Sequence, residues 1–414
     1  MRSKQGTDAH PFRHYLIAKC LIAAVVAWPV MTLVLQSKGL SYLQIGLLNS
    51  FGAAVSLILE VPMGRLADKF GQKHALAFGA AFVALGLGIL ALSSTTPAIY
   101  LSELIMGIGL ALSSGADTAW LFAEHKRLSR EGDYLKSRST IGSVTMLFSA
   151  SSSVIGPLLF SWGAGIPLWT SVVCYLAAAG TWAGLAVHAP SPSDVLDQQD
   201  AKRANERHTV FHRLARVFSN NSLFISLAFA TTIVMTAVSN YSTYIGPFLQ
   251  SQGLPVRYLG FVLVVGKIVQ WLAIRNTYRL KKSTDEARLR VIAVIGFAIL
   301  LLLASSSASS SAWVGGGAFV LMAGLSSTFF ILIDEQVNLV ISDKYRSTML
   351  SVVAMFEEFS TIAIDPVIGA ALDALGFSRA YLLLAALLCV AFGLAIGLAG
   401  VLSTADAREH ARRI

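Results

Sequence analysis

The stretch MGRLADKFGQKH, residues 63–74, lies between two long apolar segments and is short, basic and rich in turn-forming residues. Gly64 and Gly71 tolerate the backbone angles of a tight turn, so this pattern predicts that one helix ends and another begins within a few residues. Asp68 is the only acid of the stretch and lies among three lysine and arginine residues, which indicates a specific partner for its carboxylate.

The composition of the chain places the flanking segments in a membrane. Of its 414 residues, 55% are hydrophobic and 13% are charged, whereas a soluble domain is about 25% charged. A soluble core cannot bury this much apolar surface, so lipid must be the solvent. We predict an all-α integral membrane protein.

The basic charge of the chain, +9 at pH 7, follows the expected membrane topology. Of 32 lysine and arginine residues, only Lys38, Arg257 and Arg379 fall in predicted outer loops, and only Lys19 and Lys267 fall inside predicted spans. Basic residues gather in cytoplasmic loops, and an even number of spans then places both termini in the cytoplasm. This distribution argues against a nucleic-acid partner.

Twelve apolar segments approach or exceed the roughly 20 residues that a spanning helix needs. They lie near residues 13–36, 41–62, 74–94, 97–122, 139–162, 166–188, 221–250, 256–278, 288–306, 312–340, 347–371 and 379–403.

One polar segment divides these spans into six and six. Residues 189–220 begin with a proline- and serine-rich run and continue with mixed charges, which indicates a cytoplasmic linker that ends in a short amphipathic helix on the membrane. We therefore predict a six-helix bundle over residues 1–188 and a second one over residues 221–414.

The stretch at 63–74 resembles the cytoplasmic signature of the major facilitator superfamily, G-x-L-A-D-K/R-x-G-R-K. Gln72 replaces the usual arginine. The resemblance implies two pseudo-symmetric six-helix bundles with the substrate near the membrane midplane. The second half has no good copy of the signature. The matching residues are Gly64, Leu66, Ala67, Asp68, Lys69, Gly71 and Lys73.

The same resemblance implies a conformational gate at the inner face. Asp68, with Gly64, Lys69 and Gly71 around it, is expected to meet the start of the eleventh span near Arg346, where the helix dipole favours an anion. A simple loop cap is the alternative for Asp68. Resembled exporters carry an acid at the position of Glu60, for which a pairing with inner-face cations and proton carriage both remain open.

Two acids in the fourth span are candidates because a charge inside a membrane costs about 2.5–3.5 kcal/mol on insertion scales. Glu103 stands where proton-coupled members of the family carry arginine. Its carboxylate is either a proton or substrate site or half of an ion pair. Asp117 lies near the inner end, in a run resembling bacterial efflux members, and is either a proton site or a partner of the basic loop 126–138.

Three acids lie in the eleventh span. Glu358 and Asp365 are seven residues apart and therefore lie within about 20° of one helix face, whereas Glu357 points about 100° away. Carboxylates here attract cations or carry protons, and we favour Glu358 and Asp365 over Glu357.

Other polar residues complete a predicted cavity. Lys267, near the middle of its span, either binds an anion or pairs with an acid such as Glu358, while Lys19 is close enough to its helix start to reach the interface. Asn240, Tyr241 and Tyr244 are further candidates, although tyrosines at the end of a span are often interfacial anchors.

These observations predict a secondary transporter that works by alternating access. The chain has no nucleotide-binding loop and no catalytic constellation, so we expect neither an enzyme nor ATP drive, and no metal or cofactor. Resemblance to exporters in residues 60–64 and 114–119 and at Gly156-Pro157 favours proton-coupled efflux of a small amphipathic compound by a monomer in the cell membrane. The alternative is proton-coupled uptake of a small nutrient or organic anion.

Overall fold

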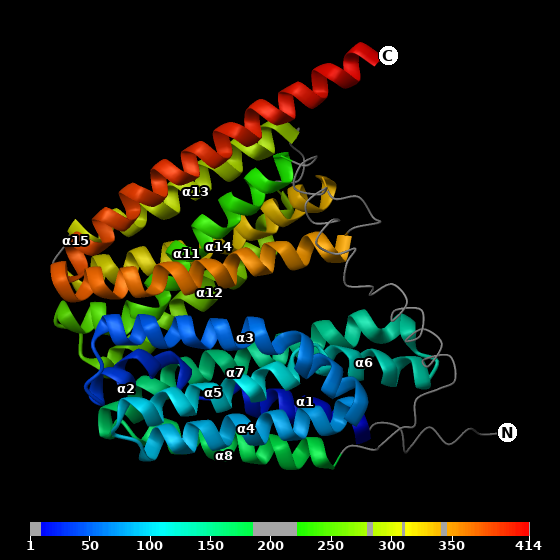
Figure 1. Ribbon diagram of the computed structural model, residues 1–414, viewed down its shortest axis with the longest axis vertical. Helices are drawn as coiled ribbons and strands as arrows, with labels where there is room; N and C mark the ends of the chain where they lie inside the picture. Colours follow the sequence, from blue (N-terminus) through cyan, green and yellow to red (C-terminus); the bar gives the residue numbers. More distant parts are fainter. Residues whose placement is uncertain (1–9, 185–221, 280–284, 309–310, 341–345, 414) are drawn as a thin grey trace.

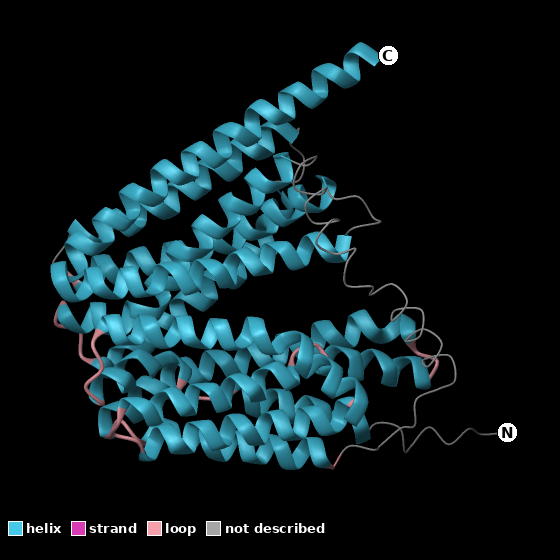
Figure 2. Cartoon of the chain, in the orientation of Figure 1, coloured by secondary structure: helices cyan, strands magenta, loops and turns pink. Residues whose placement is uncertain are grey.

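The computed structural model describes residues 10–184, 222–279, 285–308, 311–340 and 346–413. Within these residues the chain is helices joined by short turns (Figure 2). A helix satisfies its own backbone hydrogen bonds, which a segment in lipid requires. Local signals set several helix starts: Pro97 and Pro167 begin their helices, and Ser41 and Gln44 form a capping box.

The first group of helices forms one half of the molecule (Figure 1). Gly115, with φ of +73°, interrupts the predicted span 97–122 and separates α5 from α6. The elements are α1 (His10–Ala23), η1 (Trp28–Val30), α2 (Met31–Ser37), α3 (Tyr42–Phe70), α4 (Gln72–Leu92), α5 (Thr96–Ser113), α6 (Ala116–Arg127), η2 (Glu131–Asp133), α7 (Tyr134–Trp162) and α8 (Ile166–Ala183).

The second group forms the other half and lies beside the first (Figure 1). Its elements are α11 (Ser222–Ser251), η3 (Val256–Tyr258), α12 (Leu259–Thr277), α13 (Asp285–Ala308), α14 (Ala312–Val340) and α15 (Arg346–Arg413). The predicted linker lies outside the described residues.

Eleven segments of the described chain are long and apolar enough to span a membrane, against the twelve expected. The difference arises in α15, where the expected spans 347–371 and 379–403 merge into the single segment Val353–Val401. Its 49 residues would form a straight helix of about 70 Å, more than twice the thickness of a bilayer core. However, Gly376 has non-helical angles (φ 72°, ψ 171°), and the chain turns back there (Figure 1).

The signature stretch is more helical than the sequence pattern predicts. Helix α3 continues to Phe70, so Gly64 lies inside the helix and not in a turn. The reversal occurs at one residue, Gly71, whose φ of +87° few other residues tolerate, and α4 begins immediately afterwards. The expectation of two turn glycines was therefore wrong for Gly64.

The two groups touch backbone to backbone where α3 packs along α15. A Cβ atom on Gly46 would overlap the main-chain carbonyl of Asp365, and one on Gly369 would overlap that of Tyr42. Small residues permit this close approach in membranes. We call this contact the α3–α15 seam.

A second contact joins the groups through α7 and α12. A Cβ atom on Gly260 would lie 2.8 Å from the Cα atom of Val154, so glycine is required here as well. We call this contact the α7–α12 seam.

The two ends of the molecule differ in how closely the groups approach. At one end, called the Asp373 end, α3 begins and α15 turns back; at the other, the Asp68 end, α3 ends and the ribbons diverge (Figure 1). Burial along α3 follows the same gradient, from buried Ile45, Gly46 and Leu48 to exposed Glu60 and Asp68. The described conformation is closed at the Asp373 end.

The seam predicts opposite outcomes for two glycine-to-alanine changes on α3. Gly46→Ala forces backbone atoms apart and should lower the thermal-unfolding midpoint of the purified protein, because overpacking costs about 1–3 kcal/mol. Gly64→Ala is the matched control, since its Cβ meets nothing within 4 Å, and alanine is better than glycine inside a helix by about 0.5–1 kcal/mol. Equal midpoints for the two variants would contradict this account of the seam.

Candidate functional site

Three adjoining cavities lie between and beside the two groups. The Glu103 cavity, of about 310 Å³, is bounded by residues of both groups, and it shares the wall residues Pro29, Ser242, Leu263 and Phe319 with the Lys267 cavity, of about 270 Å³. A third space of about 660 Å³, the Glu357 cavity, is bounded by the second group alone and adjoins the Lys267 cavity at Gln270. Together they provide room for a small molecule beside the α7–α12 seam.

Glu103 extends from α5 into the first of these cavities. Its carboxylate touches Gly52, where a Cβ atom would lie 2.5 Å from Oε1. No described residue forms a hydrogen bond or an ion pair with it, so the ion-pair alternative finds no support in the described chain. A carboxyl group in this setting is stabilised by a proton or by a ligand from the cavity.

Asp365 holds together helices from both groups. Its Oδ2 accepts a hydrogen bond from Asn49 Nδ2 of α3 at 3.2 Å, and its Oδ1 accepts one from Asn240 Nδ2 of α11, also at 3.2 Å. The side chain is 8% exposed. The buried Asn240 Oδ1 has no partner among the described residues. Asp365 therefore lies at the α3–α15 seam, while Asn49 also lines the Glu103 cavity.

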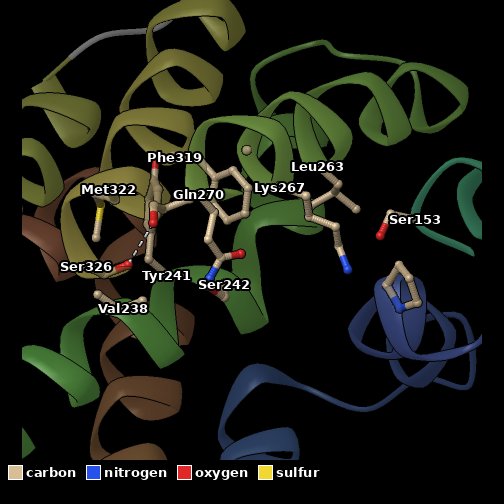
Figure 3. Close-up of a pocket in the computed structure, with 13 residues that line it drawn as sticks. Ser153, Val238, Tyr241, Ser242, Leu263, Lys267, Gln270, Phe319, Met322 and Ser326 are labelled. Atoms are coloured by element: carbon tan, nitrogen blue, oxygen red, sulfur yellow. Dashed lines mark hydrogen bonds between the residues drawn. The ribbon is translucent and has the colours of Figure 1, made fainter. Parts of the chain in front are cut away.

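Lys267, near the middle of α12, crosses the interface between the groups. Its Nζ donates to Ser149 Oγ of α7 at 2.5 Å. The expected alternative, a pair with Glu358, does not form in the described chain. The ammonium and the Gln270 amide project from α12 into the same space, and Ser153 of α7 lies on the opposite side (Figure 3).

Tyr241 and Tyr244 are buried and are not interfacial anchors. The Tyr241 hydroxyl donates to the carbonyl of Gly315 at 3.0 Å, and its ring forms part of the wall of the Lys267 cavity. Tyr244 packs edge-on against Tyr42 of the first group at 5.8 Å between ring centroids. Its hydroxyl has no partner among the described residues.

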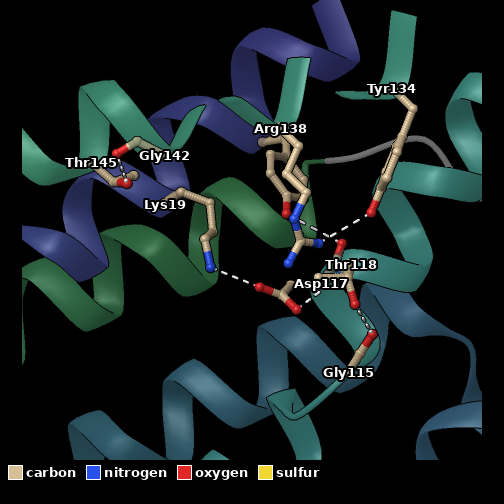
Figure 4. A network of polar contacts seen from close by, with 9 residues as sticks. Lys19, Gly115, Asp117, Thr118, Tyr134, Arg138, Gly142 and Thr145 are labelled. Carbon is tan, nitrogen blue, oxygen red and sulfur yellow. Dashed lines mark hydrogen bonds and ion pairs between the residues drawn. The ribbon is translucent and has the colours of Figure 1, made fainter. Parts of the chain in front are cut away.

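Asp117 does not face the cavities but pairs with Lys19 inside the first group (Figure 4). The Lys19 ammonium lies 2.7 Å from Asp117 Oδ2, and the Thr118 N–H donates to Oδ1 at 2.7 Å. Tyr15 adds a hydrogen bond to the Asp117 carbonyl at 3.2 Å. Because the carboxylate already has its partners within the first group, this arrangement favours a structural role.

The acids of α15 near the Asp68 end face two directions. Glu357 lines the cavity named after it, whereas Glu358 lies close enough to Glu60 of α3 for the two carboxylates to repel each other. Glu358 and Asp365 thus both face α3, as their spacing predicts. Neither Glu60 nor Glu358 has a hydrogen-bond or ion-pair partner among the described residues.

The predicted gate around Asp68 lies only partly within the described residues. Asp68 and Lys69 are exposed at the end of α3. Arg346 begins α15, but its side chain and residues 341–345 lie outside the described part, so the expected pairing stays a prediction.

The opposite end carries a contact that sequence reasoning missed. Asp373 of α15 accepts hydrogen bonds from the backbone N–H groups of Tyr42 at 3.0 Å and Leu43 at 2.8 Å, the first two residues of α3. A carboxylate at a helix N-terminus satisfies free N–H groups and is favoured by the helix dipole. This cap fastens the second group to the first at the Asp373 end.

Two helix groups that meet through glycine seams, with polar side chains in cavities between them, are the arrangement expected of a membrane transporter. The chain belongs to the Major Facilitator Superfamily, whose family model matches residues 20–363. It is therefore a multi-pass membrane transporter and not an enzyme.

Known proteins similar to this chain share its fold over nearly its whole length. The uncharacterized MFS-type transporter YxaM of Bacillus subtilis (strain 168) is 22% identical over 363 residues, which cover 87% of this chain and 89% of the relative. A D323A mutant of the nucleoside transporter NupG superimposes with a TM-score of 0.78 at 14% identity, covering 95% of this chain and all of that one. The D-xylose-proton symporter superimposes with a TM-score of 0.69 at 11% identity, covering 93% of this chain and 96% of that one.

The Asp373 cap predicts how a single substitution changes the conformational equilibrium. Asp373→Ala removes both hydrogen bonds, and loss of an N-cap costs about 0.5–2 kcal/mol, so the Asp373 end should open more often. Spin labels at the exposed positions Ser37 and Ser378 would report a larger long-distance population. Asp373→Asn, which keeps one acceptor oxygen, should produce a smaller change. Unaltered distances in the alanine variant would contradict a latching role for the cap.

Proposed function

We propose that this chain is a secondary active transporter of the cell membrane that exports a small amphipathic compound in exchange for protons by alternating access. The observation that most supports this proposal is the position of Glu103. Its carboxylate has no polar partner in the described chain and lies in a cavity bounded by both groups. The resemblance of residues 60–64 and 114–119 to exporters supports the direction.

In this proposal Glu103 carries the coupling proton. No described cation or hydrogen-bond donor holds the carboxylate, so it is free to exchange a proton with the cavity. Cargo and proton then compete for one space, since Glu103 shares the cavity with the apolar walls that receive the cargo. Competition of this kind makes each promote release of the other, as an exchange mechanism requires.

Asp365 connects protonation with movement of the groups. An ionised carboxylate accepts the two amide hydrogen bonds from Asn49 and Asn240 most strongly. A proton on either oxygen weakens the bond made there and therefore loosens the link between α3 and α15. Protonation of this buried acid thus favours opening of the seam.

The described conformation corresponds to an inward-facing state in this proposal. The Asp373 end is the outer face, both termini are cytoplasmic, and the protein works as a monomer with bundles at residues 1–188 and 221–414. When the groups rock to the outward-facing state, the Asp68 end closes. Asp68, with Gly64, Lys69 and Gly71, then meets the start of α15 near Arg346, and Glu60 approaches the same inner face.

The second candidate function is proton-coupled uptake of a small nutrient or organic anion. Lys267 favours it, because this ammonium lines a cavity that no described carboxylate shares. The D-xylose-proton symporter is an example of the same fold with a proton-coupled activity. The geometry of Glu103 and Asp365 serves either direction of transport.

Glu103→Gln tests the coupling step. Reconstituted vesicles containing a trapped pH dye are challenged with a panel of amphipathic anions, cations and neutral compounds, and cargo-dependent proton flux is recorded in each direction. The variant should lose transport driven by a pH gradient but retain exchange of labelled cargo at equal pH, because the amide cannot release a proton.

Asp133→Asn provides the matched control, since this exposed carboxylate lies in a short turn away from the cavities. It should leave gradient-driven transport intact. If the Glu103 variant still couples cargo transport to the pH gradient in full, the proposed proton site is refuted. If proton flux accompanies cargo only in the uptake direction, the second candidate function is established.

A further inference from the structure

The Lys267 cavity holds a positive charge without a balancing negative one. Among its described lining residues, Lys267 is the only charged side chain. Its described hydrogen bond goes to the neutral hydroxyl of Ser149. The side chain is half-buried, in the middle of a helix too long to let the ammonium reach either interface easily.

The other interior lysine shows what a balanced charge looks like in the same protein. Lys19 lies 2.7 Å from Asp117 Oδ2, so the ion pair is complete without any ligand. A cation in a low-dielectric region is costly unless it is paired. No described residue supplies a counter-charge to Lys267, so a group that enters the cavity can supply it.

The lining supplies both a polar and an apolar surface for such a group. Gln270 and Ser242 present an amide and a hydroxyl that make no hydrogen bond with any described residue, and Gln270 projects into the same space as Lys267 (Figure 3). Most of the remaining wall is apolar, with Phe319 and Leu263 shared with the Glu103 cavity, and the hydroxyl groups of Ser153 and Ser326 bond to their own helices. A molecule with one anionic group and one apolar part would match these two surfaces of the cavity.

We infer that the cargo is an amphipathic monoanion whose carboxylate or sulfonate binds Lys267 and Gln270 while its apolar body lies against Phe319 and Leu263. This inference rests on the proposed function only in taking the cavity as part of the transport path, and it holds for export and for uptake.

Binding of the anion also acts on the α7–α12 seam. The Lys267–Ser149 bond lies about 10 Å along α12 from the glycine contact at Gly260, given a 1.5 Å rise per residue. An anion competes with Ser149 for the ammonium, because its hydrogen bond joins two opposite charges whereas Ser149 offers only a neutral acceptor. The cargo therefore replaces a link between the two groups.

Three naphthalene probes of matched shape test the charge assignment. Purified protein is titrated with 2-naphthoate, 2-naphthamide and 2-naphthylmethylammonium, with naphthalene-2-sulfonate and decanoate as further anions, and the thermal-unfolding midpoint is followed. At least one anion should raise the midpoint at lower concentration than the amide or the ammonium compound. Lys267→Gln should weaken that anion about tenfold, and Lys267→Arg should restore most of the binding.

Lys19→Gln is the matched control, because it removes an interior cation that already has a partner, and it should leave anion binding unchanged. The inference is overturned if no anion produces a shift that depends on Lys267, or if the ammonium probe binds as well as the anions. Coupled proton flux with cationic cargo would overturn this inference and leave the proposed function standing. Anion binding that depends on Lys267, without any proton flux, would support this inference and overturn the proposed function.

Discussion

The architecture depends on the place where α3 and α15 approach each other most closely, at two glycines. Gly46 and Gly369 bring each helix against a main-chain carbonyl of the other, and two carboxylates of α15 fix the contact. Asp373 caps the first N–H groups of α3, and Asp365 accepts a hydrogen bond from Asn49, about two turns farther along α3. Because dispersion forces and hydrogen bonds, and not the hydrophobic effect, hold helices together in lipid, so close a contact determines how the two groups sit.

The ionisable residues of the interior divide into two kinds according to their partners. Lys19 and Asp117 neutralise each other within the first group and leave nothing for a ligand to do. Glu103 and Lys267, by contrast, line neighbouring cavities, and neither has an oppositely charged partner in the described chain. The protein itself thus supplies the counter-charge at one place, whereas in the proposed mechanism protons and cargo supply it at the other.

Most of the fold could be predicted from the sequence, because a membrane requires long apolar segments for its spans and favours basic residues in the loops on one side. It also singled out Glu103, Asp365 and Lys267, since any charge in an apolar span is conspicuous. Their partners were not predictable: Lys267 and Ser149 are 118 positions apart, and only packing brings them together. Asp373 was missed because an acid at the end of a span is ordinary in composition and acquires meaning only from the N-terminus beside it.

Two local features were misjudged for a related reason. Gly64 continues a helix whereas Gly115 ends one, although each is a glycine at the edge of an apolar run. Glycine permits both conformations, and neighbouring helices decide which one occurs. The expected eleventh and twelfth spans form one continuous helical element, and a single glycine, Gly376, turns the chain between them without a polar loop.

The glycine contacts between the halves have a consequence for how such a protein diversifies. The surfaces that slide and separate are made largely of main-chain atoms, whereas the walls of the cavities are made of side chains. Many substitutions that alter cargo preference can therefore leave the contact glycines in place, and new chemistry can arise through wall residues while Gly46, Gly260 and Gly369 stay fixed. The side chains that determine selectivity can therefore vary, whereas the glycines of the α3–α15 and α7–α12 seams admit almost no substitution.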